Sequence, residues 1–576
     1  MNAVEQTGQS HAPVKIETPV LIVGAGPAGQ LAALLLSHQG IASTIVERRV
    51  ERSTAPKAHA VNPRTLEICA SVGLAMDEFY RLAAPASQGG LVQFMSSLSG
   101  VALGALPYER QDDAVRALTP YPLANIAQPR FEQLLSQAID QRNDISVLRG
   151  CTCTDVAQDA DGVSVQVELK SAASPVIVRS QYLLAADGAN SRIRDRLGIT
   201  MEGPEAIEHY MMIHFRADLS ELVAANPGIL YFLCHPDISA MMIAYDHADN
   251  WVLMQRCDPA EHTRDNFDVD TCIDLIRKAV GKPVGHITIC NVSPWVMSSQ
   301  VANEYRRGRI FLVGDAAHRF PPTGGLGLNT GVGDVQNLCW KIAAIENGWA
   351  EPALLDSYEA ERKAVAEVNS TQSLHNAVKM FDLFAYLYGD NTDQQKLHFE
   401  KICSEALTSP ELKAAIEVQR PHFDSLGLQL GYSYADEAWR SEPGIDISDY
   451  RPSYSPGSHL PHFWLKGEGD SAVSILEQLP VNQFSLLVTA GQQGWRALLN
   501  SIDIPVLCLC EGADFVGLHE AWGEQAALAD TGALLIRPDG HIAAVFERPM
   551  GDAKQRLCAA LAAQLCNPLL KAEKVA

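Results

Sequence analysis

Three features that this sequence lacks, or has little of, narrow the classes of protein to which it can belong. No apolar stretch reaches the roughly 18 to 20 residues that a helix needs to cross a bilayer, which excludes a membrane-spanning protein. Positive charge is scarce: 45 Lys and Arg stand against 68 Asp and Glu, a formal net charge of −23. No cluster of Lys and Arg offers the basic face of a nucleic-acid binder. We therefore expect neither a membrane partner nor a nucleic-acid partner.

The third missing feature is the CxxC pair. The 13 cysteines are an odd number and are scattered along the chain, so a disulfide framework is not expected. Cys508 and Cys510 stand one residue apart in an apolar, alternating segment, which is typical of buried structural cysteines. The first residues, MNAVEQTGQSHAPVKIETP, lack the apolar core of a secretory signal. These observations predict a cytoplasmic protein without a bound metal.

A nucleotide-binding pattern begins near residue 19. Residues 19–49 read as a strand, a tight turn, a helix that stops at Gly40 and a second strand. Gly24-Ala25-Gly26-Pro27-Ala28-Gly29 has GxGxxG spacing. In this motif the first glycine allows the turn, the second lets a pyrophosphate approach the backbone, and the third lets the helix pack on the strand. Glu47 ends the second strand, where a carboxylate can accept from a ribose hydroxyl. The pattern predicts an adenine dinucleotide and leaves FAD and NAD open.

The rest of the chain divides by its periodicity. Residues 130–140 predict an amphipathic helix, about 206–295 is rich in strand patterns, and 351–425 is helical. A linker rich in Pro, Ser and Tyr near residue 455 precedes a small α/β domain. The stretch GDAAHRFPPTGGLGLNTG, residues 314–331, follows an apolar strand and precedes a long helix. Its density of glycine predicts that a ligand passes close to the backbone.

Three stretches taken together resemble one family. GAGPAG with Glu47 and Arg48, then DGANSRIR, then GDAAH with PPTGGLGLN match the three fingerprints of class A flavoprotein monooxygenases of the para-hydroxybenzoate hydroxylase type, in order. DSYEAER, PGSHLPHFWL and LLIRPDGHIAA also resemble the larger phenol and 2-hydroxybiphenyl hydroxylases. The resemblance implies an α/β fold with a Rossmann-like, GR2-type FAD-binding domain, an inserted β-sheet substrate domain and a C-terminal thioredoxin-like α/β domain without CxxC.

The resemblance also implies where these domains lie. The FAD-binding domain is discontinuous and comprises residues 1–75, 122–205 and 296–370, and the substrate domain comprises residues 76–121 and 206–295. Residues 371–455 form a helical extension and linker, and 456–576 form the thioredoxin-like domain. Because there is a single GxGxxG motif, NADH or NADPH is expected to visit a shallow site as a transient co-substrate.

Residues expected to hold FAD follow from the same resemblance. Asp315 is expected to bind the ribityl chain, since a carboxylate accepts several O–H bonds without competing donors. The backbone at Gly327, Leu328 and Asn329 is expected to face the flavin, because amides at a helix N-terminus stabilise the negative charge of the reduced ring. The other expected FAD contacts are Gly24, Gly26, Pro27, Ala28, Gly29, Glu47, Arg48, Lys57, Gln128 and Asp187. For Asp187, the alternative is a cap for the helix that follows it.

The segment PKAHAVNPRTLEI, residues 56–68, resembles the same segment of phenol-hydroxylating enzymes. His59 falls where those enzymes place a titratable group near the phenol oxygen, and the pKa of histidine suits removal of a phenolic proton. The alternative is a structural histidine on a loop. Substrate contacts are predicted for Pro322 and, in the β-rich segment, for His214, Tyr231 and Tyr245, with a core position as the alternative for these last three.

Taken together, the resemblance implies an FAD-dependent monooxygenase that hydroxylates a phenolic ring with NAD(P)H and O2 through a flavin C4a-hydroperoxide. A homodimer is expected from the same family. One rival is a flavin monooxygenase of the same fold that performs epoxidation or Baeyer–Villiger oxidation in a biosynthetic pathway, where His59 need not act as a base. A second rival is a non-catalytic FAD-binding sensor.

Overall fold

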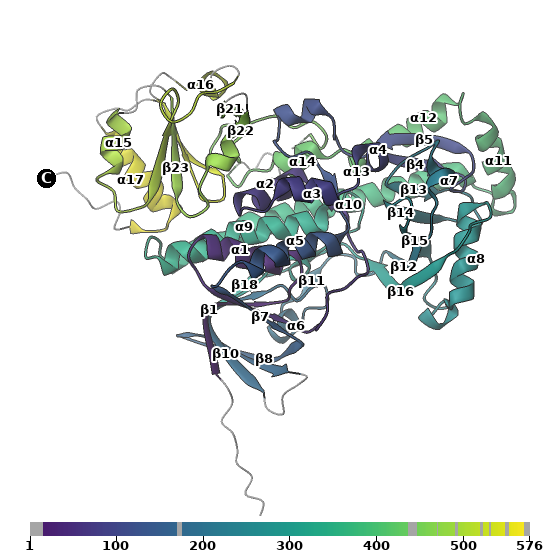
Figure 1. Ribbon diagram of the computed structural model, residues 1–576, viewed down its shortest axis with the longest axis horizontal. Coiled ribbons are helices and arrows are strands. Elements are labelled where there is room, and N and C mark those ends of the chain that lie inside the picture. Colours follow the sequence, from purple (N-terminus) through teal and green to yellow (C-terminus); the bar gives the residue numbers. More distant parts are fainter. Residues whose placement is uncertain are drawn as a thin grey trace, which may run out of the picture.

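The computed structural model describes residues 15–169, 175–435, 446–468, 471–489, 493–518, 522–528, 532–547 and 552–568. Three parts follow one another along its longest axis, with a central α/β part between a β-sheet domain at one end and the C-terminal domain at the other (Figure 1). Residues 1–14, the segment in which no secretory signal is expected, lie outside the described residues.

An eight-stranded sheet forms the centre of the described chain. Strand β1 (Lys15–Val23) pairs in parallel with β10 (Val176–Ala185) and with β2 (Ser43–Glu47). β10 also pairs antiparallel with β9, which pairs antiparallel with β8. The other strands are β7 (Ile145–Arg149), β8 (Cys151–Asp159), β9 (Gly162–Leu169), β18 (Arg306–Arg307) and β19 (Ile310–Leu312). The Rossmann-like sheet expected from the GxGxxG pattern is thus confirmed.

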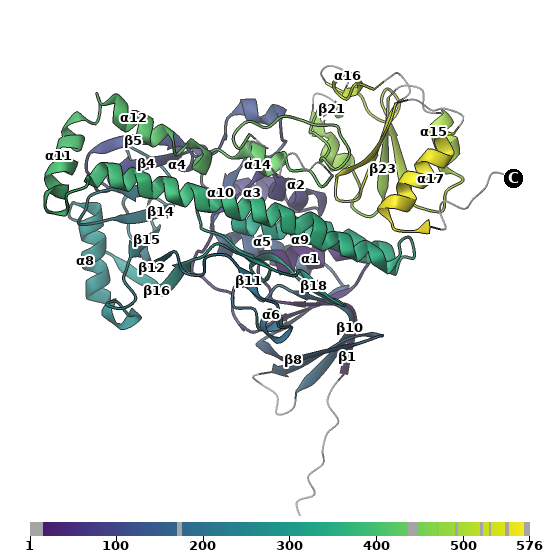
Figure 2. The same ribbon diagram turned by 180° about the vertical axis from the view of Figure 1, so that it is seen from behind.

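Helix α1 (Pro27–His38) packs against α5 (Gln128–Asp140) and α9 (Leu326–Glu346) above this sheet (Figure 1). Its apolar side chains are buried on every side, as expected for a helix between a sheet and other helices. The long helix α10 (Asp356–Tyr388) packs on α9 and continues to the β-sheet domain (Figure 2). It runs through the predicted border at residue 370, so the helical extension is continuous with the central part.

The second sheet has seven strands among the described residues, in the order β16-β12-β15-β14-β13-β4-β5. One face packs against α8 (Val269–Val280), and the opposite face packs against α10 and the helices that follow it. The strands are β4 (Leu91–Met95), β5 (Ala102–Pro107), β12 (Glu208–Arg216), β13 (Leu230–Leu233), β14 (Ala240–Asp246), β15 (Asn250–Arg256) and β16 (Thr288–Met297). The following helices are α11 (Gln395–Glu405), α12 (Pro410–Glu417) and α13 (Arg420–Phe423).

Several short elements join the central part to the β-sheet domain. Strand β3 pairs with β6, and the small sheet β11-β17-β20 contacts α10 through β17. The strands are β3 (Ala60–Val61), β6 (Ala124–Asn125), β11 (Met201–Glu202), β17 (Gln300–Ala302) and β20 (His318–Arg319). The helices are α2 (Pro63–Ser71), α3 (Met76–Leu82), α4 (Ala86–Gly89), α6 (Arg192–Arg196), α7 (Ser220–Val223) and α14 (Leu426–Leu430).

The C-terminal domain is built on the sheet β24-β23-β25-β26, in which β24 is parallel to β23 and the other pairs are antiparallel. Its core includes Trp340 and Ala344 of α9, so the domain is seated on the far end of that helix. Its elements are β21 (Trp464–Lys466), β22 (Ala472–Ser474), β23 (Phe484–Val488), α15 (Gln493–Leu499), β24 (Val506–Cys510), α16 (Trp522–Gln525), β25 (Ala533–Ile536), β26 (Ile542–Phe546) and α17 (Ala553–Gln564).

Candidate active site

A cavity of about 1360 Å³ lies between the central part and the seven-stranded sheet. It exceeds the roughly 300 to 1000 Å³ that is usual for one bound molecule, so it has room for a cofactor and a substrate together. One end is lined by the GAGPAG turn and the end of β2, and the other by β12 to β16 and α10. Among the described residues, no cluster of His, Cys, Asp or Glu is arranged to hold a metal ion.

The three motif glycines have three different surroundings. Gly24 adopts φ +113°, and a Cβ there would lie 2.1 Å from the carbonyl oxygen of Ala186. A Cβ on Gly29 would lie 2.0 Å from the carbonyl oxygen of Gly24, which shows how closely α1 approaches the turn. At Gly26 a Cβ would enter open space that belongs to the cavity. The first and third glycines therefore serve the fold, and the second leaves the backbone open to a ligand, together with Pro27 and Ala28 beside it.

Polar side chains of the predicted cofactor set surround this end of the cavity. Glu47 accepts hydrogen bonds from the backbone of Ala25 at 2.9 Å and of Arg49 at 2.8 Å, and its carboxylate retains further acceptor capacity toward the cavity. Gln128 donates to Glu132 at 2.7 Å and lines the cavity. Arg48 and Lys57 line it with exposed side chains.

Asp315 and Asp187 both line the cavity. Asp315 follows Gly314, which adopts φ +59°, and the side chain of Asp315 is exposed in the cavity. Desolvation by the surrounding protein nevertheless raises the pKa of Asp315, despite the nearby His318 and Lys57. One oxygen of Asp187 accepts from the backbone of Ile193 at 3.4 Å, and the other has no partner among the described residues. Asp187 therefore acts as a cap for α6, while its second oxygen is buried, and its contact with FAD stays a prediction.

The loop before α9 brings backbone to the cavity. Gly324 and Gly325 adopt φ +112° and +63°, and a Cβ on Gly327 would meet nothing within 4 Å. Leu328 lines the cavity. Asn329 does not: its side chain accepts from the backbone of Asn62 and the hydroxyl of Thr65, and donates to two carbonyls. All the polar capacity of the side chain is thus used to join α9 to the start of α2, and the expected contact of the Asn329 backbone with the flavin stays a prediction.

His59 is held by a defined hydrogen bond. Its Nδ1 lies 2.9 Å from Oδ1 of Asn125, and Nδ2 of Asn125 donates to the carbonyl of Gly89 at 2.9 Å. Since the amide nitrogen is committed to a carbonyl, Oδ1 is the acceptor and Nδ1 of His59 is the donor. Nε2 therefore keeps its lone pair. Burial lowers the pKa of His59 to about 4, so the ring is neutral near pH 7.

Strand alternation decides which residues of the seven-stranded sheet reach the cavity. On β13, Leu230 and Phe232 line it, whereas Tyr231 lies on the opposite face and donates to the carbonyl of Asn226 at 3.2 Å. This corrects the predicted substrate contact of Tyr231. His214 lines the cavity with Nε2 2.9 Å from Oδ1 of Asn250.

The other two predicted substrate residues differ from each other. Pro322 lines the cavity. Tyr245 does not, but its ring lies edge-on to His59 with 6.0 Å between the centroids. The hydroxyl of Tyr245 is buried without a partner among the described residues. Tyr245 thus supports the histidine rather than reaching the cavity itself.

Sequence reasoning missed residues that reach the cavity from elsewhere in the fold. Tyr108, at the end of β5, lines the cavity with its ring 5.6 Å from that of His59. His422 of α13 also lines it and stacks on Phe423 at 4.0 Å. Helix α10 contributes Ala377, Met380, Phe381, Phe384 and Tyr388. The helical spacing of this last group was a usable signal, whereas nothing near Tyr108 or His422 in the sequence indicates a site.

Comparisons with known proteins agree with this geometry. Residues 17–373 match the model of the FAD binding domain family, and residues 453–568 match that of the aromatic-ring hydroxylase C-terminal domain. The chain is 31% identical to 4-methyl-5-nitrocatechol 5-monooxygenase of Burkholderia sp, over 97% of this chain and 99% of the relative. It is 29% identical to phenol 2-monooxygenase of Pseudomonas sp. (strain EST1001), over 92% and 89%.

A solved structure shares the whole architecture. The flavin-dependent monooxygenase PieE, crystallised with FAD and substrate, superimposes with a TM-score of 0.87 at 32% identity, covering 97% of this chain and 100% of that one. The open backbone at Gly26 and Gly327 and the cavity-facing carboxylate of Asp315 fit an FAD molecule. Among the described residues, no helix is both long and apolar enough to cross a membrane. The chain belongs to the class A FAD-dependent aromatic monooxygenases.

Proposed function

We propose that the enzyme hydroxylates a phenol whose hydroxyl group hydrogen-bonds to Nε2 of His59. The observation that carries this proposal is the fixed tautomer of His59: Asn125 engages Nδ1, so the free lone pair belongs to Nε2. The relatives whose names include phenol or nitrocatechol support a hydroxylated ring as the substrate class.

The chemistry assigned to His59 follows from its burial. Protonation would give His59 a positive charge that burial separates from water, and this cost lowers the pKa of His59. A phenolate formed beside the ring supplies an opposite charge, so the proton moves to Nε2 as negative charge develops on the phenol oxygen. That charge enriches the ring carbons ortho and para to the oxygen. Bound FAD, reduced by NADH or NADPH, supplies the activated oxygen that such a carbon accepts.

The roles of the cofactor residues are part of the same proposal. The backbone at Gly26 would approach the pyrophosphate, Glu47 and Arg48 the adenosine half, Asp315 the ribityl chain, and Leu328 the flavin. The surroundings of Gly26 and the place of Asp315 in the cavity wall support these roles. The side chain of Asn329 is proposed only as a brace for α9.

Replacing His59 with Phe tests the proposal. We expect kcat/KM for the best phenol to fall by about 10² to 10⁴, because general-base catalysis contributes that much, with more hydrogen peroxide released per NAD(P)H oxidised. Asn125→Leu keeps the imidazole but frees its tautomer, so a smaller loss is expected. For the wild type, a plot of kcat/KM against pH should show no change due to histidine ionisation between about pH 5 and 7, because His59 has a pKa of about 4 and is neutral throughout this range.

A panel of phenols scored for NAD(P)H oxidation, peroxide release and product mass identifies the substrate. Failure of every phenol to stimulate oxidation would overturn the proposal. Fully coupled turnover by the His59→Phe variant would favour epoxidation or Baeyer–Villiger oxidation instead.

A homodimer and a cytoplasmic location complete the proposal. Both rest on the resemblance to the family and on the charge pattern of the chain. Light scattering of the purified enzyme at several concentrations tests the first, and cell fractionation tests the second. A monomer at every concentration, or recovery outside the cytoplasm, would contradict them.

A further inference from the structure

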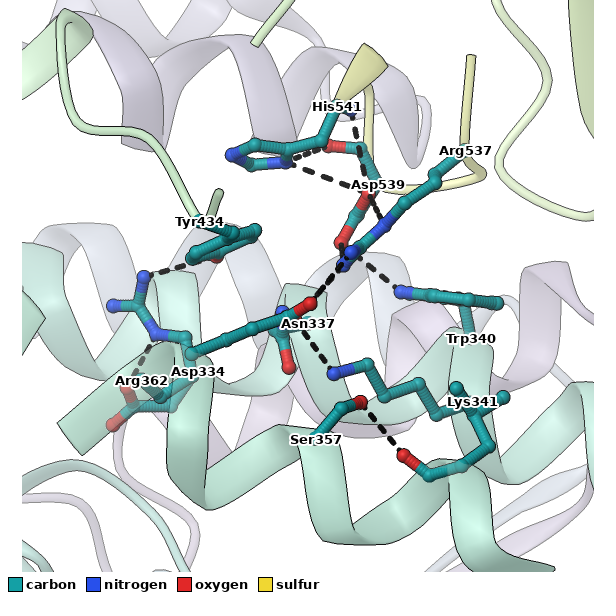
Figure 3. Close-up of polar contacts among 12 residues, drawn as sticks. Asp334, Asn337, Trp340, Lys341, Ser357, Arg362, Tyr434, Arg537, Asp539 and His541 are labelled. Atoms are coloured by element: carbon teal, nitrogen blue, oxygen red, sulfur yellow. Dashed lines mark hydrogen bonds and ion pairs between the residues drawn. The ribbon is translucent and has the colours of Figure 1, made fainter. Parts of the chain in front are cut away.

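Charged side chains of the C-terminal domain reach into the central part of the molecule. The turn between β25 and β26 carries Arg537 and Asp539, which point toward α9 and α10 (Figure 3). Arg537 is 6% exposed and Asp539 is 1% exposed, so both charges are buried. The guanidinium of Arg537 also lies over the ring of Trp340, 5.1 Å from its centroid.

The first contacts in this region join the turn to both helices. Arg537 donates to Glu361 of α10 at 2.7 and 3.0 Å, and to Asp539 at 2.5 and 3.0 Å. Glu361 in turn accepts from Lys341 of α9 at 2.7 Å. Asp539 accepts from the indole of Trp340, also on α9, at 3.0 Å. Through these contacts, the turn between β25 and β26 links α9 to α10.

A second network starts at Arg362, the next residue of α10, and Tyr434 links it to the first. The hydroxyl of Tyr434 accepts from Arg362 at 3.2 Å, and its ring lies 5.3 Å from the guanidinium of Arg537. Arg362 donates to Asp334 of α9 at 2.9 Å, and the other oxygen of Asp334 accepts from the backbone of Gly314 at 3.1 Å. That same oxygen lies 2.8 Å from Nε2 of His318. Gly314 immediately precedes Asp315, the carboxylate in the cavity wall. This second network therefore ends at the turn that presents Asp315.

Helix α9 packs tightly against the turn at Gly314. A Cβ on Gly331 of α9 would lie 2.9 Å from Cα of Gly314, closer than side chains are found in proteins. A shift of α9 must therefore move Gly314 and Asp315 with it. Buried ion pairs contribute little net stability compared with apolar packing, and their best-attested use is to specify one arrangement.

We propose that the C-terminal domain is energetically coupled to FAD binding, with Arg537 as the positioning residue that holds α9 and α10 in the arrangement that binds the cofactor. Such a coupling is reciprocal: if the domain favours FAD binding, FAD must stabilise the domain by the same factor. A domain that served only as a rigid attachment would show no response to the cofactor.

Hydrogen–deuterium exchange of the wild-type protein, with FAD removed and then restored, tests this reciprocity directly. We expect amides of β25 and β26 to exchange about 5 to 150 times more slowly when FAD is bound, the usual range of such couplings. Equal exchange in the two states would overturn the proposal, and this result needs no variant.

A matched pair of variants tests the role of Arg537. Arg537→Met should weaken FAD binding by about 5- to 150-fold in a fluorescence titration and abolish the FAD-dependent protection of β25 and β26. Arg496→Met removes the exposed pair with Asp514 in the same domain, at 2.5 and 2.6 Å, and should change neither quantity. Equal FAD affinity in the two folded variants would overturn the assignment to Arg537; if Arg537→Met does not fold, the wild-type exchange experiment decides.

Discussion

At the scale of single residues, Asp315 places an exposed carboxylate in the cavity wall. Desolvation by the surrounding protein raises the pKa of Asp315, which means that its charged form is less favourable in the folded protein than in the unfolded chain. For an acid shifted in this direction, the folded protein loses stability as the pH rises from the ordinary value through the raised one. Because the side chain of Asp315 is exposed in the open cavity, solvent screening keeps this effect small in the cofactor-free protein.

Asp315→Asn should separate stability from cofactor binding. We expect the unfolding temperature of the cofactor-free variant at pH 7 to stay close to that of the wild type, because the exposed carboxylate is screened by solvent. FAD affinity should fall roughly 10- to 150-fold, because a hydrogen bond to a charged group contributes about 1.5 to 3 kcal/mol. Differential scanning fluorimetry and FAD titration measure the two effects. Asp113→Asn, at a fully exposed carboxylate, is the control, and a loss of stability without loss of FAD affinity would contradict the prediction.

At the scale of elements, α10 both packs against α9 and lines the cavity. Its buried face packs on α9, while its last turns place Met380, Phe384 and Tyr388 in the cavity, each four residues from the next. This spacing puts the three side chains on one face of the helix. An aromatic substrate held between the sheet and α10 would therefore rest on this face.

Phe384→Ala should weaken substrate binding and leave the chemistry intact. We expect KM for the preferred aromatic substrate to rise about tenfold, since removing part of an apolar contact surface costs about 1.4 kcal/mol, while kcat changes little. Tyr386→Ala is the matched control, because Tyr386 lies on the same helix, is 37% exposed and does not line the cavity. An equal change in KM for both variants, or a change confined to kcat, would show that α10 does not contact the substrate.

At the scale of the whole molecule, no disulfide contributes to the fold. All 13 cysteines have free thiols, including Cys508 and Cys510 on β24. Burial raises the pKa of the Cys508 thiol, which keeps it in the unreactive protonated form. Stability must come mainly from apolar packing, while the buried ion pairs specify how the parts are arranged.

Reduction should therefore leave the enzyme unchanged. We expect the same unfolding temperature and the same FAD content with and without an excess of dithiothreitol, measured by scanning fluorimetry and by absorbance. A fall in unfolding temperature of several degrees on reduction would reveal a disulfide and refute the expectation.

Much of the whole architecture could be read from local pattern. The GxGxxG turn, its flanking strands and helix, the β-rich segment and the small α/β domain were predicted from short-range periodicity, and the structure contains all of them. The domain borders were harder, because α10 continues through the border expected at residue 370. Nothing in the helical pattern marks the point where a continuous helix passes from one domain to another.

The sequence alone determined which glycine-rich segments line the cavity, because glycine at positive φ and carboxylates at strand ends are local requirements. Tertiary structure decided which side chains reach the cavity. Tyr231 and Phe232 are neighbours in the sequence, yet strand alternation sends them to opposite faces. Asn125 sets the tautomer of His59 from 66 residues away, and Arg537 meets Glu361 across 176 residues. Such partners are brought together by the packing of elements, which no local pattern encodes.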